Sequence, residues 1–419
     1  MKLKHLTVAA AVTVLSACGG SSGGASSEQD VCDKLTSDSF SCDALLQDLV
    51  SEGVQPVVNS LSTKLTELDT KVSAYCAAIS NGTLLEDARN AWSDVMAPLQ
   101  QLQVMNFGPN TDAETGLLPF YDWESADPFN IDIAIAKSAS FENIGLSVSD
   151  NEKDLVTLEY VLFDIAAIQT YSNPENENPN VKSWRTGKSD EEIQQDRCDY
   201  AKLVSSYLND KGLSLKSAWE GYDFVAASSS KQASANEVAK ALFYVDKITK
   251  DLKVKSALPQ PDDSESTFDA GKLESQFANE SKAAIKNNLM GTKIMLTLND
   301  SDNSKTALND YLTAAGFESI GTNMLTTLDA AIANIDAVNE DLYSAVKAAM
   351  DANDESVATQ CKTVAGNGTY IADGASESSD IETFCALQYQ LKMFTDILKG
   401  DFTTLTSFTI PPSASGDND

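Results

Sequence analysis

NIGLSVSDNEKDLVTLEYVLFDIAAI, at residues 143–168, is the segment from which the arrangement of this chain is most easily understood. Ser149 and Glu152 have the S-x-x-E spacing of a capping box, which predicts that a helix begins near Asp150. Between residues 155 and 168 only three side chains are polar. Because a helix that is apolar on every side is a buried helix, this segment predicts a helix inside an α-helical protein.

Glu159 is an acidic residue in the middle of this apolar helix. Its neighbours three and four positions away are all apolar, namely Leu155, Val156, Leu162 and Phe163. A buried carboxylate without a partner costs several kcal/mol or stays protonated. We therefore expect a partner from elsewhere in the fold: a basic side chain, a set of hydrogen-bond donors or a bound cation. If Glu159 is structural, its natural bidentate partner is one of the arginines of the chain, which are Arg89, Arg185 and Arg197.

The N-terminus has the features of an exported lipoprotein. Residues 1–17 combine a basic start, an apolar run and small residues, which predicts a secretory signal peptide. Leu-Ser-Ala before Cys18 resembles the site at which bacterial lipoproteins are cleaved and lipidated, and residues 18–30 follow as a flexible tether. The alternative is an ordinary signal peptide followed by a chance cysteine.

The lipoprotein interpretation predicts where the protein lies. Gly19 after the cysteine resembles the pattern for sorting to the outer membrane, on either its periplasmic or its external face. No later stretch is apolar enough to span a bilayer. We therefore expect an outer-membrane lipoprotein whose contact with the membrane is the lipid on Cys18.

Charge and histidine content exclude several classes of function. The formal net charge is −32, and the signal carries two lysines and no acidic residue, so the mature chain is near −34. Nucleic acid and anionic lipid surfaces are therefore poor partners. The single histidine, His5, lies in the signal. The mature chain thus lacks the usual general base, the Ser-His and Cys-His nucleophile pairs, and histidine ligands for zinc or haem.

Six cysteines remain after Cys18, an even number that predicts up to three disulfides in an exported protein. Proximity in the sequence favours Cys32 with Cys42 and Cys361 with Cys385, which leaves Cys76 with Cys198. Six cysteines allow fifteen pairings, so other connectivities stay open. None of the cysteines has the spacing of a metal site.

Long amphipathic patterns and short turns predict an all-α fold of two packed helical bundles, with loop-rich insertions in the N-terminal half. The helices are expected at residues 43–78, 84–105, 189–230, 233–254, 271–298, 304–314, 320–351 and 381–399. A linker rich in proline and acidic residues lies at residues 258–266. It divides an N-terminal domain, residues 31–256, from a C-terminal domain, residues 267–400, and residues 401–419 form a tail.

Three segments carry a resemblance to one family. The segment GLSVSDNEKDLVTLEYVLFD, residues 145–164, resembles the signature of the imelysin-like proteins, bacterial envelope proteins once classed as M75 peptidases. Their motif is Gly-x-His-x-x-Glu. Aligned on the final Glu, this chain has Asp154 for the Gly, Val156 for the His and Glu159 for the Glu. The acid is retained and the histidine is lost.

The other two resemblances lie on either side of this motif. Around residues 92–109 the family's Trp and its Phe-Gly-Pro are matched by Trp92, Phe107, Gly108 and Pro109. In the loop that follows, Trp123 and Tyr121 either line a pocket or anchor the loop in the core. Near residues 281–291 the family's Ser, Asn and Gly are matched by Ser281, Asn288 and Gly291. Ser281 and Asn288 offer neutral oxygens to a cleft, whereas Gly291 permits close helix packing.

The resemblance implies two helical bundles side by side, with the Glu-bearing motif at the cleft between them. It also implies an envelope binding protein concerned with iron or another metal. Without histidine or free cysteine the ligands would be oxygens, which suit hard cations such as iron or calcium. Glu159 is the candidate metal ligand, and Asp154 and Trp123 are further candidates for the cleft. The alternative is a protein-interaction module with a decayed metal site. A metallopeptidase is disfavoured because Val156 stands in the histidine position.

Overall fold

The structure is a computed structural model that describes residues 40–138, 148–164, 178–227, 229–300, 304–367 and 380–403. Within these ranges every regular element is a helix, which confirms the all-α class. The α-helices of the first half are α2 (Cys42–Asp48), α3 (Gln55–Cys76), α4 (Gly82–Val104), α5 (Pro128–Ser138), α6 (Leu155–Phe163), α7 (Pro179–Arg185), α8 (Asp190–Glu220), α9 (Phe224–Ala227) and α10 (Lys231–Leu242). Those of the second half are α11 (Ser281–Thr297), α12 (Leu308–Ala314), α13 (Glu318–Ala337), α14 (Leu342–Ala352), α15 (Glu355–Asn367) and α16 (Asp380–Ile397).

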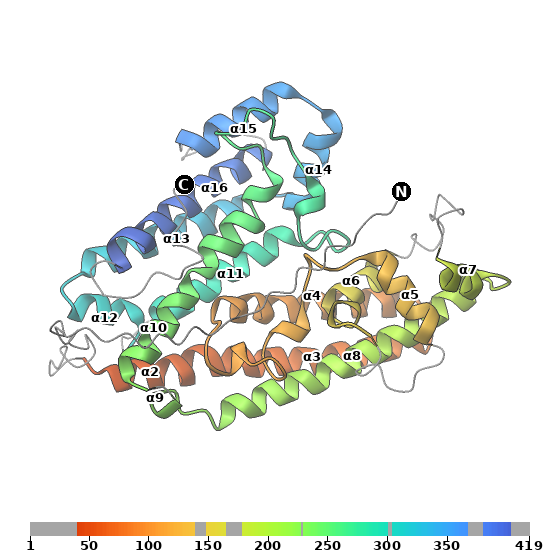
Figure 1. The fold of residues 1–419 in the computed structure, drawn as a ribbon, viewed down its shortest axis with the longest axis horizontal. Coiled ribbons are helices and arrows are strands. Elements are labelled where there is room, and N and C mark those ends of the chain that lie inside the picture. Colours follow the sequence, from red (N-terminus) through yellow and green to blue (C-terminus); the bar gives the residue numbers. More distant parts are fainter. Residues whose placement is uncertain are drawn as a thin grey trace, which may run out of the picture.

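The helices form two bundles that share one hydrophobic core. In Figure 1 α3, α4 and α8 lie along the lower side of the molecule, and α13, α15 and α16 lie along the upper side. Helix α11 packs against α4 of the lower bundle and α13 of the upper one. The buried apolar side chains of both bundles join in a single cluster. The packed two-bundle architecture is thus confirmed, while the domain boundaries stay a prediction.

Helix α3 shows how sequence pattern builds the lower bundle. Leu61, Leu65, Leu68 and Val72 recur at helical spacing and are all buried, so one face of α3 packs against α4 and α8. The helix predicted at residues 43–78 is present, but in three parts: α2, a π-helical segment (Leu49–Val54) and α3. Helix α4 agrees closely with its prediction. Its N-cap Asn81 accepts hydrogen bonds from the backbone N–H groups of Thr83 and Leu84.

The central helix α6 is shorter than the sequence predicted. Glu152 does accept a hydrogen bond from the backbone N–H of Ser149 at 3.2 Å, but this capping box closes a 3₁₀ turn (Asp150–Glu152). The α-helix begins at Leu155 because Asp154 is its N-cap and accepts from the N–H of Thr157 at 3.0 Å. It ends at Phe163, and residues 165–177 lie outside the described ranges.

Several other predicted boundaries were wrong, and one error bears on function. Helix α11 begins at Ser281 instead of residue 271. Within the segment before it, Ser275 and Asn279 have φ angles of 52° and 59°, in the left-handed region that an α-helix excludes. The prediction at 189–230 is divided into α8 and α9, and that at 320–351 into α13 and α14. The sequence patterns missed α5, α7 and α15.

Two predicted disulfides are confirmed. Cys76–Cys198 joins the end of α3 to α8, and Cys361–Cys385 joins α15 to α16. Cys32 of the third predicted pair lies outside the described residues, as do the signal, Cys18 and its tether. In the part of the chain that is described, no helix has the length and apolar character needed to cross a membrane.

Candidate functional site

Helix α6 is held near both of its ends by side chains of α4. Trp92 of α4 donates its indole N–H to the carbonyl of Leu155 at 2.8 Å, which fixes the start of α6. Arg89 of α4 donates to the carbonyl of Leu162 at 2.9 Å, near the end of the helix. Trp92 of the second matched segment thus positions the helix that carries the motif.

The predicted arginine partner for Glu159 is wrong. Arg197 of α8 forms a buried ion pair with Asp132 of α5 at 3.3 Å and donates to the carbonyl of Tyr160 at 3.2 Å. Arg89 is engaged at the α6 carbonyl, and Arg185 is the last residue of α7. The arginines Arg89 and Arg197 therefore stabilise α6 through its backbone carbonyls and do not neutralise its carboxylate.

Glu159 meets backbone donors from the second half of the chain. Its Oε1 accepts hydrogen bonds from the N–H groups of Phe277 at 2.9 Å and Ala278 at 3.0 Å, and the residue is 1% exposed. The left-handed residues Ser275 and Asn279 flank this pair of donors. Successive backbone N–H groups in such a turn form a concave binding site for an anionic oxygen. The expectation that Glu159 is buried and met by a distant segment is confirmed.

A small pocket of about 80 Å³ opens beside Glu159. Val156 and Glu159 of α6 line it on one side, Trp123 on another, and residues 273–277 on a third. The structure therefore brings together the motif acid, the residue in the motif's histidine position and the loop tryptophan. The oxygen-bearing side chains of its wall include Glu159, Glu274 and Ser275, and most of the remaining wall is apolar.

Burial dominates the electrostatics of this pocket. It raises the pKa of Glu159 to about 8, although the two backbone N–H groups oppose the rise. The nearby carboxylate of Glu274 raises the pKa of Glu159 further, because two negative charges at close range repel each other. Glu159 therefore carries its proton in a large share of molecules at neutral pH.

Asp154 supports the pocket without lining it. One carboxylate oxygen caps α6, and the other accepts the backbone N–H of Asp122 at 2.8 Å. Burial raises the pKa of Asp154 to about 7. Because Asp122 directly precedes Trp123, the bond fixes the loop that places the tryptophan in the pocket.

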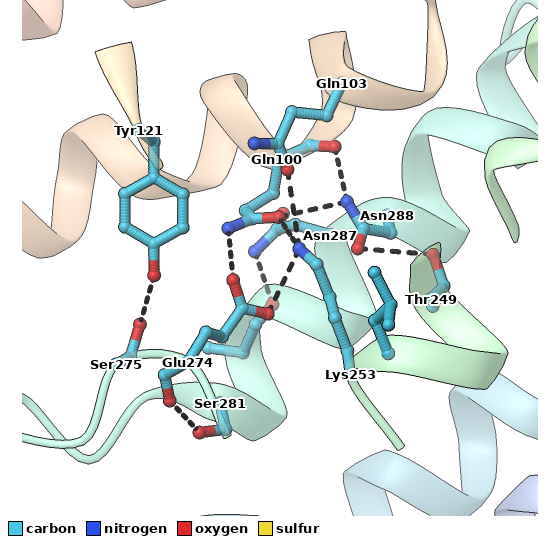
Figure 2. Close-up of polar contacts among 12 residues, drawn as sticks. Gln100, Gln103, Tyr121, Thr249, Lys253, Glu274, Ser275, Ser281, Asn287 and Asn288 are labelled. Carbon is cyan, nitrogen blue, oxygen red and sulfur yellow. Dashed lines mark hydrogen bonds and ion pairs between the residues drawn. The ribbon is translucent and has the colours of Figure 1, made fainter. Parts of the chain in front are cut away.

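A buried polar network lies behind the pocket wall and links both halves of the chain (Figure 2). Glu274 lies 3.1 Å from the ammonium nitrogen of Lys253 and accepts a hydrogen bond from Gln100 of α4 at 3.1 Å. Asn288 of α11 donates to the carbonyl of Gln100 at 2.7 Å. Ser281 donates to the carbonyl of Glu274. Ser281 and Asn288 thus lie within the packed contact of α11, where both are buried.

Sequence reasoning missed Lys253, Glu274 and Gln100. Glutamine and lysine are common on exposed helix faces, and Glu274 fell within a segment predicted to be helical, so no local pattern marked them as buried. Their burial follows from contacts between segments that are more than 150 residues apart in sequence.

The remaining matched residues stabilise packing away from the pocket. Phe107 stacks on Phe224 with ring centroids 5.2 Å apart, and Gly108 has a φ of 53°. Phe107, Gly108 and Pro109 line a separate surface pocket near the end of α4. A Cβ at Gly291 would lie 2.5 Å from the carbonyl oxygen of Gln101, so this glycine allows α11 to approach α4 closely.

The donor set does not fit a resident metal ion. Among the described residues, no three histidine, cysteine, aspartate or glutamate side chains gather as a metal site requires. Glu159 already accepts two backbone N–H groups, and Glu274 already faces the Lys253 ammonium. Hard cations such as iron and calcium need several oxygen ligands at once. An iron or calcium ion bound at Glu159 would have to displace the two backbone N–H groups from Glu159 and the Lys253 ammonium from Glu274.

Comparisons with known proteins identify a family and a related fold. The family model described as Imelysin, peptidase M75, matches residues 54–366. The fold is similar to that of an imelysin-like protein from Psychrobacter arcticum, with a TM-score of 0.59 at 16% identity over 88% of this chain and 96% of that one. It is also similar to a protein from Parabacteroides distasonis named an iron-regulated protein A precursor, with a TM-score of 0.57 at 16% identity over 86% and 95% of the two chains. No curated protein matches the sequence.

Proposed function

The chain belongs to the imelysin family, and from this premise we propose that it is a lipid-anchored binding protein of the cell envelope with a part in iron acquisition, and not a peptidase. The signal and Cys18 support the envelope location. The family and the name of the Parabacteroides distasonis protein support the connection with iron. At 16% identity that structure supports a common fold, so what it adds to the connection with iron is its name.

The absence of peptidase activity is proposed from the residues of the motif. A metallopeptidase needs a metal-bound water, usually held by histidine ligands. Val156 stands where the motif has histidine, and the mature chain contains no histidine at all. The observation that carries the proposal is the bond between Glu159 and the N–H groups of Phe277 and Ala278. It gives the motif acid the role of joining α6 to the second half of the chain.

A second candidate is a protein-interaction module of the envelope. Glu159 and Glu274 already have partners within the protein, so their site gains little from binding an ion. This favours an interaction module over an ion-binding protein. In this case the protein would take part in iron acquisition by binding a partner protein. The acidic mature chain would favour a partner with a basic surface.

Growth of the host under iron limitation tests the primary proposal. We expect deletion of the gene to slow growth when iron is scarce and to leave growth unchanged when iron is abundant. The intact protein should restore growth, and the unanchored Cys18→Ser variant should restore it less well. Equal growth of the deletion and parent strains under iron limitation would refute the role in iron acquisition.

A separate assay tests the negative part of the proposal. Homogeneous mature protein should not cleave an unstructured protein substrate, with or without added divalent metal. A reproducible cleavage that a chelator abolishes would show that the chain is a metallopeptidase.

A further inference from the structure

Lys253 is a buried cation that is paired with Glu274, a residue of the pocket wall. Its side chain is fully buried, and its ammonium nitrogen lies 3.1 Å from Oε1 of Glu274 (Figure 2). The same nitrogen donates to Oε1 of Gln100 at 2.5 Å and to that of Gln103 at 3.4 Å. It also lies 5.9 Å from the ring centroid of Tyr244. The ammonium is thus surrounded by oxygens and an aromatic face, as a bound cation would be.

The ligands of this ammonium come from separate parts of the chain. Gln100 and Gln103 belong to α4, while Glu274 belongs to the segment before α11 that also donates to Glu159. Lys253 directly follows the π-helical segment Val245–Leu252. The ammonium therefore joins three elements at the place where the two halves of the chain meet, and joining distant elements is also what a structural metal ion does.

Glu274 connects this ion pair to the pocket. Its carboxyl group is 1% exposed, and the residue also lines the pocket beside Glu159. Without a positive charge nearby, a buried carboxylate close to a second acid would be strongly disfavoured. The only cation that the described structure places within salt-bridge distance of Glu274 is Lys253.

We propose that the ammonium of Lys253 is the resident cation of this site, so that the junction between the two halves is complete without a metal ion. This role of Lys253 does not depend on which partner or ligand the protein binds. It also explains why Glu274 is not free to bind a metal ion at the pocket wall: its counter-charge is already supplied by Lys253.

The proposal predicts that removing the ammonium creates a dependence on added cations. In Lys253→Met the unbranched side chain keeps nearly the same length and loses its charge, so Glu274 remains buried without a counter-charge. A hard cation that enters from the pocket could then take the place of the ammonium beside Glu274, which lines the pocket wall. Binding to the folded state would raise the melting temperature of the variant.

The experiment compares melting temperatures of full-length mature protein in a chelator and in millimolar calcium or manganese. We expect the wild type to change by less than about 1 °C, whereas Lys253→Met should melt lower in chelator and recover by about 3 °C or more in the divalent cation. The double variant Lys253→Met/Glu274→Gln should not respond, because it lacks the carboxylate that would bind the ion.

Lys250→Met is the matched control. It removes another buried ammonium, which lies 3.0 Å from Asp246 and does not border the pocket. This variant should melt lower than the wild type without any response to cations. An equal response of Lys250→Met and Lys253→Met would overturn the proposal, since the effect would then be general.

A second double variant and the wild type itself provide two further tests. If Lys253→Met does not fold, Lys253→Met/Glu274→Met replaces the pair by apolar side chains of similar volume and should fold without a response to cations. The wild type itself also tests the proposal. A wild-type melting temperature that falls in chelator and returns with calcium, manganese or iron would show that a metal ion, and not Lys253, completes the site.

Discussion

Glu159 joins α6 to the segment before α11 through two backbone hydrogen bonds, so its substitutions should separate the role of its oxygen from the role of its charge. Glu159→Ala removes a buried side chain and leaves two partly buried N–H groups without their acceptor, so it should lower the free energy of unfolding by roughly 3 kcal/mol. Glu159→Gln keeps an oxygen that can accept both bonds and should cost no more than about 1 kcal/mol. Urea denaturation at neutral pH measures both, and equal losses would contradict the hydrogen-bonding role.

Two buried acids should make the stability of the protein depend on pH. Burial raises the pKa of Glu159 to about 8 and that of Asp154 to about 7, so the folded state binds these protons more tightly than the unfolded state does. The stabilisation from the protonated forms is fully present below about pH 4, near the pKa values of the unfolded chain. It is lost as the pH rises through the folded pKa values.

This pH dependence is tested by measuring the free energy of unfolding of the wild type and of Glu159→Gln at pH 5 and at pH 9. Because glutamine does not ionise, the variant should lose less stability over this interval than the wild type loses. If the two proteins show the same pH dependence, Glu159 does not titrate in the folded state as its burial implies.

At the scale of elements, the contact of α4 with α11 depends on the absence of a side chain at Gly291. A Cβ there would lie 2.5 Å from the carbonyl oxygen and 2.8 Å from the Cα of Gln101, which are backbone atoms that cannot move aside alone. We expect Gly291→Ala to cost about 2 kcal/mol by overpacking, measured by urea denaturation.

Gly82→Ala is the control for this substitution. Gly82 is the first residue of α4, and nothing lies within 4 Å of a Cβ built on it. Since alanine is the better helix former, this variant should be neutral or more stable by up to about 1 kcal/mol. If both variants lose stability, the loss in Gly291→Ala is not caused by the contact with α4.

The two confirmed disulfides should differ in their effect because they close loops of different length. Cys76–Cys198 spans 122 positions and joins α3 to α8, whereas Cys361–Cys385 spans 24. Loop-closure entropy assigns about 5 kcal/mol to the first and about 3 kcal/mol to the second. Paired Cys→Ser substitutions should therefore lower the melting temperature more for the α3–α8 bond. The reverse order would mean that strain or residual structure outweighs the entropy of the unfolded chain.

For the whole molecule, the acidic surface of the mature chain makes the lipid on Cys18 its expected means of attachment to an anionic membrane. Acyl chains bind bilayers with about 0.8 kcal/mol for each buried methylene group. The wild type should therefore sediment with membranes, and Cys18→Ser should appear in the soluble envelope fraction. Retention of the variant on membranes after a salt wash would contradict anchoring by lipid.

Much of the architecture of the molecule can be predicted from local sequence patterns. The apolar spacing in α3 and α4 predicts two long helices of the first bundle, and the apolar ring around Glu159 predicts a buried acid that needs a distant partner. Cysteine number and spacing favour Cys76–Cys198 and Cys361–Cys385, and the structure contains both. These features are predictable because each depends on residues within a few helical turns or on simple counting.

The identity of the partners at the site depends on how distant segments pack. Three arginines are available for Glu159, yet it is met by backbone N–H groups 118 and 119 positions away. Those donors are presented by a segment whose left-handed residues, Ser275 and Asn279, are not glycines. Only Asn279 is of a type enriched in this region, so the local signal of a turn is weak. Lys253 and Glu274 look like surface residues in the sequence, and they are buried together because packing α4 against α11 encloses them. A buried charge is stable only beside its counter-charge, and that proximity is a property of the assembled fold.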